Sequence, residues 1–294
     1  MAGGGREERV CPGPGGHGGG VAGFLRPADR RSSARRSGSS GVDAILGIRD
    51  GDGDGAGHPA RSDGRRIHRR TRLVSERSGD RRVIRAEFRG REPFAPCLAY
   101  QLEVREQVVA KTSPGTLILV EHPPVLTLGR RGRREDILWP DEALARFGIE
   151  VCTSPRGGEV TLHAPGQLVA YPVVHVGRRI RGHIEDLGEV AVSLLSELGV
   201  EDAVFRMDHP GVWVGERKIA SIGIHVSRGV TVQGIAINLD VERRLFGALV
   251  PCGTPGLEMV NAVDLGAPRV AMDHAARRFA SLWSERTGVD LAWS

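Results

Sequence analysis

The fold is decided by the stretch Gly211-Val-Trp-Val-Gly-Glu-Arg-Lys-Ile-Ala-Ser-Ile-Gly-Ile-His-Val-Ser-Arg-Gly-Val-Thr-Val-Gln-Gly-Ile-Ala-Ile-Asn-Leu239. It contains three runs rich in Val and Ile, at 211–215, 218–227 and 230–239, and such runs predict β-strands. Only two residues separate each run from the next. A connection this short cannot hold the helical crossover that parallel neighbours require. The three strands are therefore predicted to be antiparallel.

Working outward, the chain alternates between further strand and helix patterns. Strands are predicted at 116–120, 159–163 and 167–174, and helices at 96–111, 184–198 and 271–287. The middle helix is amphipathic, because apolar residues recur every three or four positions before Gly199 as C-cap: Leu187, Val190, Ala191, Leu194, Leu195 and Leu198. Pro123-Pro124 ends the 116–120 strand, since neither proline can donate to a ladder. The fold class is α+β (mixed α/β), a mixed, largely antiparallel sheet packed by helices.

Charge divides the chain into an N-terminal extension and a folded domain. Residues 1–82 carry 17 Arg and 10 acidic residues, a balance of +7, whereas the remaining 24 Lys and Arg against 26 acidic residues give −2. The extension is also rich in Gly and Ser and poor in large apolar residues, so it cannot bury enough surface to offset its ordering entropy. We expect residues 1–82 to be disordered and 83–294 to form the catalytic domain.

Two patterns in the extension resemble binding sites without completing them. Asp50-Gly-Asp-Gly-Asp54 starts like a calcium loop, but position twelve is Arg61, where a bidentate Glu is needed. The arginine-rich stretch 61–82 has no interleaved aromatic residues, so a solvated tail is a better interpretation than a nucleic-acid site. We therefore expect neither calcium nor nucleic acid as a partner.

The sequence shows no feature of a membrane protein or of a metal site. No apolar run approaches the roughly 20 residues that span a bilayer, and the N-terminus lacks the apolar stretch of a secretory signal. We expect a cytoplasmic protein. The four cysteines, Cys11, Cys97, Cys152 and Cys252, form no C-x-x-C and no zinc-finger spacing with His. This argues against a metal or other cofactor and leaves single-thiol chemistry open.

Three segments stand out as candidates for chemistry. The first is Arg156-Gly-Gly-Glu-Val-Thr-Leu-His163-Ala-Pro-Gly-Gln167, where paired glycines let backbone amides approach a ligand. A glycine-rich hairpin without function would be the better explanation if the segment stood alone.

The second candidate is Lys218, which enters an apolar strand. Lys111 and Lys218 are the only lysines beside 39 arginines, which hints that an amine is needed there. Burial disfavours the charged form of an amine and makes it available for proton transfer. The alternative is a lysine at a strand end that extends its ammonium group to water.

The third candidate is Cys252, in Leu249-Val-Pro-Cys-Gly253. A thiol between Pro and Gly is expected on a turn, where it is accessible to a substrate. Free cysteines are more often small buried hydrophobic residues, so the motif alone does not decide between the two roles.

In this order, the three segments resemble the lipoyl(octanoyl) transferase family, also called lipoate-protein ligase B. The resemblance covers about Tyr100 to Leu265 and includes Glu121-His-Pro-Pro124, Thr127-Leu-Gly129, Lys218-Ile-Ala220 and Pro251-Cys-Gly253. It implies a fold shared with biotin and lipoate ligases, with Cys252 as nucleophile and Lys218 as its activating partner. It also implies an acyl pocket lined by Arg156, Gly157, Gly158, Glu159, Val160, Thr161, Leu162, His163, Ser221, Ile222, Gly223, Gly234, Ile235 and Ala236.

The chain departs from the family pattern at three places. Ala164 follows His163 where the family usually has Gly, and Gln233-Gly-Ile235 replaces the usual His-Gly-Phe. The customary Thr-Ser pair after the cysteine is replaced near Val260-Asn-Ala262. None of these changes removes a catalytic group, but the change at Gln233 and Ile235 bears on which acyl chain the pocket accepts.

The resemblance implies transfer of an octanoyl group from octanoyl-acyl carrier protein, through a cysteine thioester, to a lysine of lipoyl domains in 2-oxoacid dehydrogenase complexes and of the glycine cleavage H protein. We expect the enzyme to act as a monomer. The main alternative is an ATP-dependent lipoate or biotin ligase, because the basic turn at 129–134 resembles an adenylate-binding loop. Those arginines could instead meet an acidic carrier protein. A catalytically silent binding protein is a third alternative, but it would not need both Cys252 and Lys218.

Overall fold

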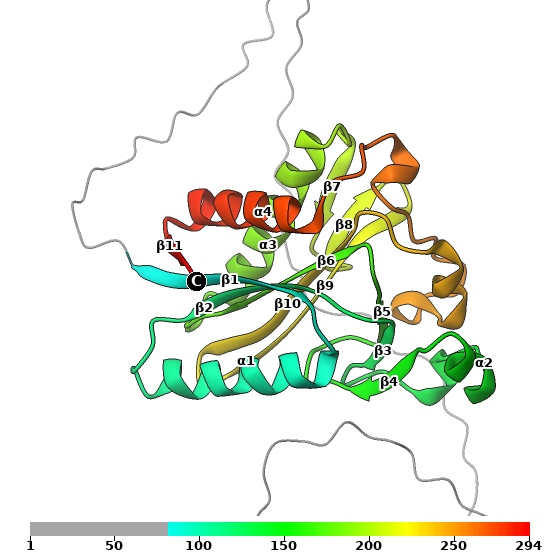
Figure 1. Cartoon of the computed structure of the whole chain (residues 1–294), viewed down its shortest axis with the longest axis horizontal. Coiled ribbons are helices and arrows are strands. Elements are labelled where there is room, and N and C mark those ends of the chain that lie inside the picture. The colour runs from blue at the N-terminus through cyan, green and yellow to red at the C-terminus, as the bar shows by residue number, and fades with distance from the viewer. Residues whose placement is uncertain (1–81) are drawn as a thin grey trace, which may run out of the picture. The chain divides into compact units, whose positions relative to one another are not determined.

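The computed structural model describes residues 82–294 (Figure 1). The predictions made for residues 1–81, including the disordered extension, the calcium-like loop and nearly all of the arginine-rich stretch, lie outside the described residues. Within 82–294, no helix combines the length and the apolar character that a membrane span requires.

A mixed sheet of eight strands forms the centre of the domain. Its spatial order is β11 (Asp290–Trp293), β1 (Val83–Arg91), β2 (Thr116–Glu121), β6 (Gln167–Val173), β10 (Val230–Asn238), β9 (Arg217–Ser227), β8 (Gly211–Val214) and β7 (Ala203–Arg206). Only β1 pairs in parallel, with β2 and with β11, and the other neighbouring pairs of this sheet are antiparallel. The predicted antiparallel pairing of the strands within 211–239 is confirmed.

A second sheet of three strands lies beside the first. Its order is β4 (Glu150–Thr153), β3 (Val125–Leu128) and β5 (Val160–His163). Helix α2 (Asp141–Arg146) and two 3-10 segments, η1 (Arg134–Asp136) and η2 (Arg243–Ala248), belong to this part of the domain. The small sheet matters for the site because β5 follows directly after the glycine-rich segment.

Helices cover both faces of the large sheet (Figure 1). Helices α3 (Ile180–Glu197) and α4 (Met272–Thr287) pack on one face, where Leu187, Leu194 and Phe279 meet Ile219 and Ile237. Helix α1 (Phe94–Val109) covers the other face through Val104 and Val108. Burial of apolar side chains on both faces is the main stabilising term of such a layered fold.

The predicted elements occur with shifts of at most a few residues. Helix α3 ends at Glu197, and Gly199 follows in the left-handed region with φ of 89°. The elements that the sequence patterns did not predict are β1, β3, β4, β7, β11, α2 and the short 3-10 segments. Most are only three to six residues long, so their periodicity is too brief to stand out.

Candidate active site

Cys252 lies on a tight turn, the 3-10 segment η3 (Pro251–Gly253), and its side chain is half-buried. Its backbone has φ of 53° and ψ of 25°, a left-handed conformation that non-glycine residues adopt rarely. Gly253 follows with φ of 64°, where glycine meets no steric cost. Strained backbone of this kind persists where the surroundings enforce it, and it often marks a functional position.

Lys218 lies near the start of β9 and is only 3% exposed. Its N–H donates to the Glu258 carbonyl, and its own carbonyl accepts from the N–H of Val260. These two bonds form a parallel bridge between Lys218 and Met259. Since the bridge begins only a few residues after Cys252, it brings the nucleophile's segment to the lysine.

Strand β8 makes room for the lysine side chain. A register shift opposite Val212 and Trp213 places a β-bulge in β9, where Ile219 is the extra residue next to Lys218, and bulges re-aim the side chains next to them. A Cβ at Gly211 would lie 2.4 Å from Lys218 Cε and 2.3 Å from the Ala220 carbonyl oxygen. Only glycine fits at position 211.

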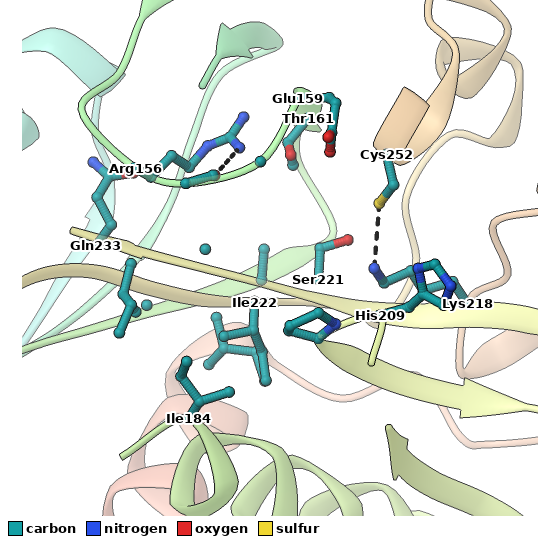
Figure 2. Close-up of a pocket in the computed structure, with 18 of the residues that line it drawn as sticks. Arg156, Glu159, Thr161, Ile184, His209, Lys218, Ser221, Ile222, Gln233 and Cys252 are labelled. Atoms are coloured by element: carbon teal, nitrogen blue, oxygen red, sulfur yellow. Dashed lines mark hydrogen bonds between the residues drawn. The ribbon is translucent and has the colours of Figure 1, made fainter. Parts of the chain in front are cut away.

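The two predicted catalytic side chains are in direct contact. Lys218 Nζ donates a hydrogen bond to Cys252 Sγ at 3.2 Å, as Figure 2 shows. The same Nζ lies 5.1 Å from the ring centroid of Trp213, a distance at which an ammonium is attracted to an aromatic face. A cation held against the sulfur favours the thiolate, the reactive form of cysteine.

A pocket of about 470 Å³ opens beside this pair. Its lining includes both catalytic candidates and thirteen of the fourteen predicted pocket residues. The exception is Leu162, which does not reach the pocket. It is 2% exposed and packs in the core between the small sheet and α2, because its side chain points to the opposite face of β5 from those of Thr161 and His163.

Several lining residues were not predicted from the sequence. They come from separate parts of the chain and are Arg131, Val169, Tyr171, Ile184, Asp208, His209, Pro210, Ile224, Gln233 and Thr254. Gln233 had been singled out only as a departure from the family pattern. Its φ is 65°, and its side chain accepts a hydrogen bond from Ser154 Oγ at 3.2 Å. The tertiary fold brings these residues together at the pocket, and the local periodicity of the sequence does not predict such contacts.

The glycine-rich segment forms one wall of the pocket around a buried arginine. Arg156 Nη2 donates to the carbonyl oxygen and the hydroxyl of Thr127, at 2.6 and 2.8 Å, and Nη1 donates to the Gly157 carbonyl at 3.1 Å. Burial lowers the pKa of Arg156 to about 10, so the group is still a cation at neutral pH. Of the paired glycines, Gly158 has φ of 87°, a left-handed conformation that favours glycine. The turn at Gly129 packs closely on this wall, since a Cβ at Gly129 would lie 2.4 Å from the Gly158 carbonyl.

Two buried histidines and a tyrosine form the His122–His163–Tyr171 cluster at another wall of the pocket. His163 and Tyr171 line the pocket, and His122 does not. Tyr171 donates its hydroxyl proton to His122 Nε2 at 3.0 Å, and His122 Nδ1 donates to the Glu92 carbonyl at 2.7 Å. His163 Nδ1 donates to Gln167 Oε1 at 2.8 Å. Burial lowers the pKa of His163 to about 3 and also lowers the pKa of His122, so both imidazoles are neutral.

The chain is similar in sequence to proteins of one known family. A model of the lipoyl protein ligase A/B catalytic domain matches residues 93–282. The chain belongs to this family. Within it, the octanoyltransferase of Solibacter usitatus is 40% identical over 189 residues, which cover 62% of this chain and 84% of the relative. The octanoyltransferase of Geobacter metallireducens is 40% identical over 204 residues, covering 67% and 92%. The chain is thus a member of the lipoyl(octanoyl) transferase family and an acyltransferase.

Solved structures of the family share the fold. A bipartite lipoate protein ligase from Thermoplasma acidophilum superposes with a TM-score of 0.58 at 17% identity, over 72% of this chain and 87% of that one. A lipoate-protein ligase A bound with ATP gives 0.57 at 15% identity, over 73% and 88%. These likenesses confirm the predicted lipoate-ligase fold. In the described part of the chain, no group of three or more His, Cys, Asp or Glu is placed to hold a metal ion.

Proposed function

We propose that the protein transfers an octanoyl group from octanoyl-acyl carrier protein to a lysine of lipoyl domains, with a thioester on Cys252 as intermediate. The observation that carries the proposal is the 3.2 Å contact of Lys218 Nζ with Cys252 Sγ at a pocket. The names of the relatives support the octanoyl group. The nucleophile and the order of transfer are inferred from the geometry.

The pocket suits an acyl chain. Apolar side chains from separate elements line it, namely Val160, Val169, Ile184, Ile222, Ile224, Ile235 and Ala236. Polar residues also line the pocket, among them the buried Arg156 and the buried Gln233. An alkyl chain would gain about 0.8 kcal/mol for each methylene that leaves water.

The first step exchanges one thioester for another. The Cys252 thiolate attacks the acyl carbon of the donor thioester, and the carrier sulfur leaves. The proton first held between Lys218 and Cys252 passes to the departing carrier thiolate, so no net proton is released. Because the bonds broken and formed are of the same kind, the step needs no ATP.

The second step forms an amide. A neutral acceptor amine attacks the Cys252 thioester, and Lys218 accepts a proton from the attacking nitrogen. The Cys252 sulfur then leaves, and Lys218 returns this proton to it. The amide is more stable than the thioester, which drives transfer forward. Lys218 thus acts in both steps, first as stabiliser of the thiolate and then as proton acceptor.

The tetrahedral intermediates of both steps need hydrogen-bond donors for the oxyanion. The sequence suggested amides near Gly157-Gly158 or near Cys252. The N–H of Gly157 already donates to the Ile224 carbonyl at 3.1 Å, and the N–H of Gly253 to the Val250 carbonyl at 3.2 Å. We propose the N–H groups of Gly158 and Cys252 as the donors.

The turn at Gly129–Gly132 argues against the ATP-dependent alternative. A phosphate-binding loop needs free backbone N–H groups. Here the N–H groups of Gly129, Arg130 and Arg131 donate to the carbonyls of Glu159, Arg156 and Gly158 at 2.9–3.0 Å. Arg131 also pairs with Glu159 at 2.8 Å. These N–H groups hold the turn against the pocket wall and are already used as donors. We therefore expect no ATP/pyrophosphate exchange.

Intact-mass measurement after mixing the enzyme with octanoyl-acyl carrier protein tests the proposal. One octanoyl group should appear, and peptide mapping should place it on Cys252. Cys97 is an internal control, because burial raises the pKa of its thiol to about 12 and keeps it unreactive. Absence of the adduct in wild type, or an adduct that persists in Cys252→Ala, contradicts the proposal.

A further inference from the structure

Amide formation creates a proton that has to leave the site. This problem rests on the proposed function. An acceptor lysine arrives as R–NH₃⁺ and gives one proton to Lys218 before its neutral amine attacks. Its overall reaction with the Cys252 thioester therefore gives an amide, the Cys252 thiol and one H⁺. The thioester exchange of the first step releases none. The second step alone therefore requires a route from Lys218 to water.

Lys218 is poorly placed to deliver that proton to water itself. Its side chain is 3% exposed, Cys252 Sγ lies at its Nζ, and the ring of Trp213 covers the same nitrogen at 5.1 Å. An incoming acyl group and acceptor would seal the pocket further. A neighbouring group that reaches both the pocket and the solvent is needed.

His209 meets both conditions. It is exposed, and it lines the pocket together with Lys218 and Cys252. Its imidazole centroid lies 6.4 Å from that of the Trp213 ring, the same ring that lies 5.1 Å from Lys218 Nζ, and Figure 2 labels His209 and Lys218 among the residues that line the pocket.

The turn that carries His209 is fixed in place. The indole N–H of Trp213 donates to the His209 carbonyl at 3.2 Å, and the N–H of Ile222 donates to the Pro210 carbonyl at 3.3 Å. Both donors lie on the strands that build the lysine site. The backbone of the turn is therefore held by β8 and β9, and the imidazole that it carries lines the pocket.

We propose that His209 is a proton-relay residue that takes the proton released in amide formation from Lys218 and passes it to water. Imidazole suits the role because it gains and loses a proton between pH 5 and 8. The charged and titratable groups around it are Asp208 on its own turn, Lys218 on β9, Cys252 on η3, and Arg206, whose guanidinium lies 5.0 Å from the Trp213 ring centroid. His209 acts through Lys218 and leaves the nucleophile untouched.

The two half-reactions measured separately test the relay. The full-length enzyme is acylated with octanoyl-acyl carrier protein, freed from the carrier, and mixed with a lipoyl domain in a rapid-quench instrument from about pH 5.5 to about pH 9. His209→Gln should slow amide formation about tenfold to a hundredfold near neutral pH and flatten its pH profile. Acylation of Cys252 should stay within about twofold of wild type, and added imidazole should restore amide formation.

One variant serves as a matched control. His274→Gln removes an exposed histidine of α4 that does not line the pocket, and both of its rates should equal those of wild type.

The outcomes distinguish the relay from the transferase cycle itself. An unchanged rate of amide formation in His209→Gln, an equal loss in both half-reactions, or a failure of imidazole to restore the rate overturns the relay. A wild-type enzyme that never acquires an octanoyl group overturns the proposed function, and the relay with it.

Discussion

Two regions of the pocket differ in how their polar side chains are held: the mouth, formed by Lys218 and Cys252, and the wall, formed by the His122–His163–Tyr171 cluster. At the mouth, Lys218 is buried against a sulfur, and Cys252 occupies a left-handed conformation. In the His122–His163–Tyr171 cluster, burial keeps both imidazoles neutral, and each imidazole donates a hydrogen bond from its Nδ1. At the mouth, a strained backbone conformation accompanies a reactive side chain. At the wall, hydrogen-bonded neutral imidazoles are unreactive and keep the shape of the pocket fixed.

The largest expected effect comes from removing the sulfur at the mouth. Cys252→Ala should lower octanoyl transfer at least about a thousandfold, because the covalent route is lost. Its free energy of unfolding should stay within about 0.5 kcal/mol of wild type, since the side chain is half-buried on a turn. Measurement of transfer and of urea unfolding would check both. Full transfer by Cys252→Ala would show that the mouth is not the reactive region.

Removing the amine should have the next largest effect. Lys218→Met keeps most of the apolar chain but loses the proton carrier, so transfer should fall about a hundredfold to ten-thousandfold. Stability should not fall, because burying an amine costs solvation energy that methionine does not lose. Lys111→Met is the matched control, since Lys111 is exposed and is the other lysine of the chain. Equal activity of the two variants would contradict the role of Lys218.

Filling the space at Gly211 should disturb the mouth without touching a reactive group. Gly211→Ala places a methyl group 2.4 Å from Lys218 Cε, which should cost about 1–3 kcal/mol of stability and lower transfer. Gly247→Ala is the control, because its nearest neighbour lies 3.8 Å from the added Cβ. Thermal unfolding and transfer assays would compare them. If both variants behave like wild type, the close approach of β8 to Lys218 is unimportant.

At neutral pH the smallest effect is expected at the wall, and it concerns the dependence of stability on pH. In the folded protein burial lowers the pKa of His163 from 6.5 to about 3, so between these values the unfolded chain binds a proton that the folded protein does not. Stability should therefore fall as the pH drops through this window, by up to about 1.4 kcal/mol per pH unit for each such histidine.

His163→Phe should reduce this acid sensitivity, because phenylalanine takes up no proton. The slope of unfolding free energy against pH is the quantity to measure, since loss of the bond to Gln167 lowers stability at every pH. His274→Gln, which removes a histidine exposed to water, should leave the slope as it is in wild type. An unchanged slope in His163→Phe would show that the wall does not hold its charge state as proposed.

Most of the long strands and helices were predictable because their patterns are long. The exception is β1, which has nine residues and was not predicted. The apolar repeat of α3 and the Val/Ile runs of β9 and β10 persist for nine or more residues, so local periodicity reported them correctly. Strands β3, β4 and β7 have four residues each and carry too little pattern. Leu162 was placed in the pocket by the resemblance, but the alternation of side chains along β5 turns it into the core.

The sequence by itself determined the layered mixed sheet, the antiparallel strands within 211–239, and the residue types of the reactive pair. It could not determine that Lys218 and Cys252 touch, or that His209 and Gln233 join them in one pocket. Those facts depend on the bulge in β9, the space at Gly211 and the bridge from Lys218 to Met259. The physical reason is that periodicity reports which face of an element is buried, whereas a catalytic contact between residues 34 positions apart exists only once the elements have packed.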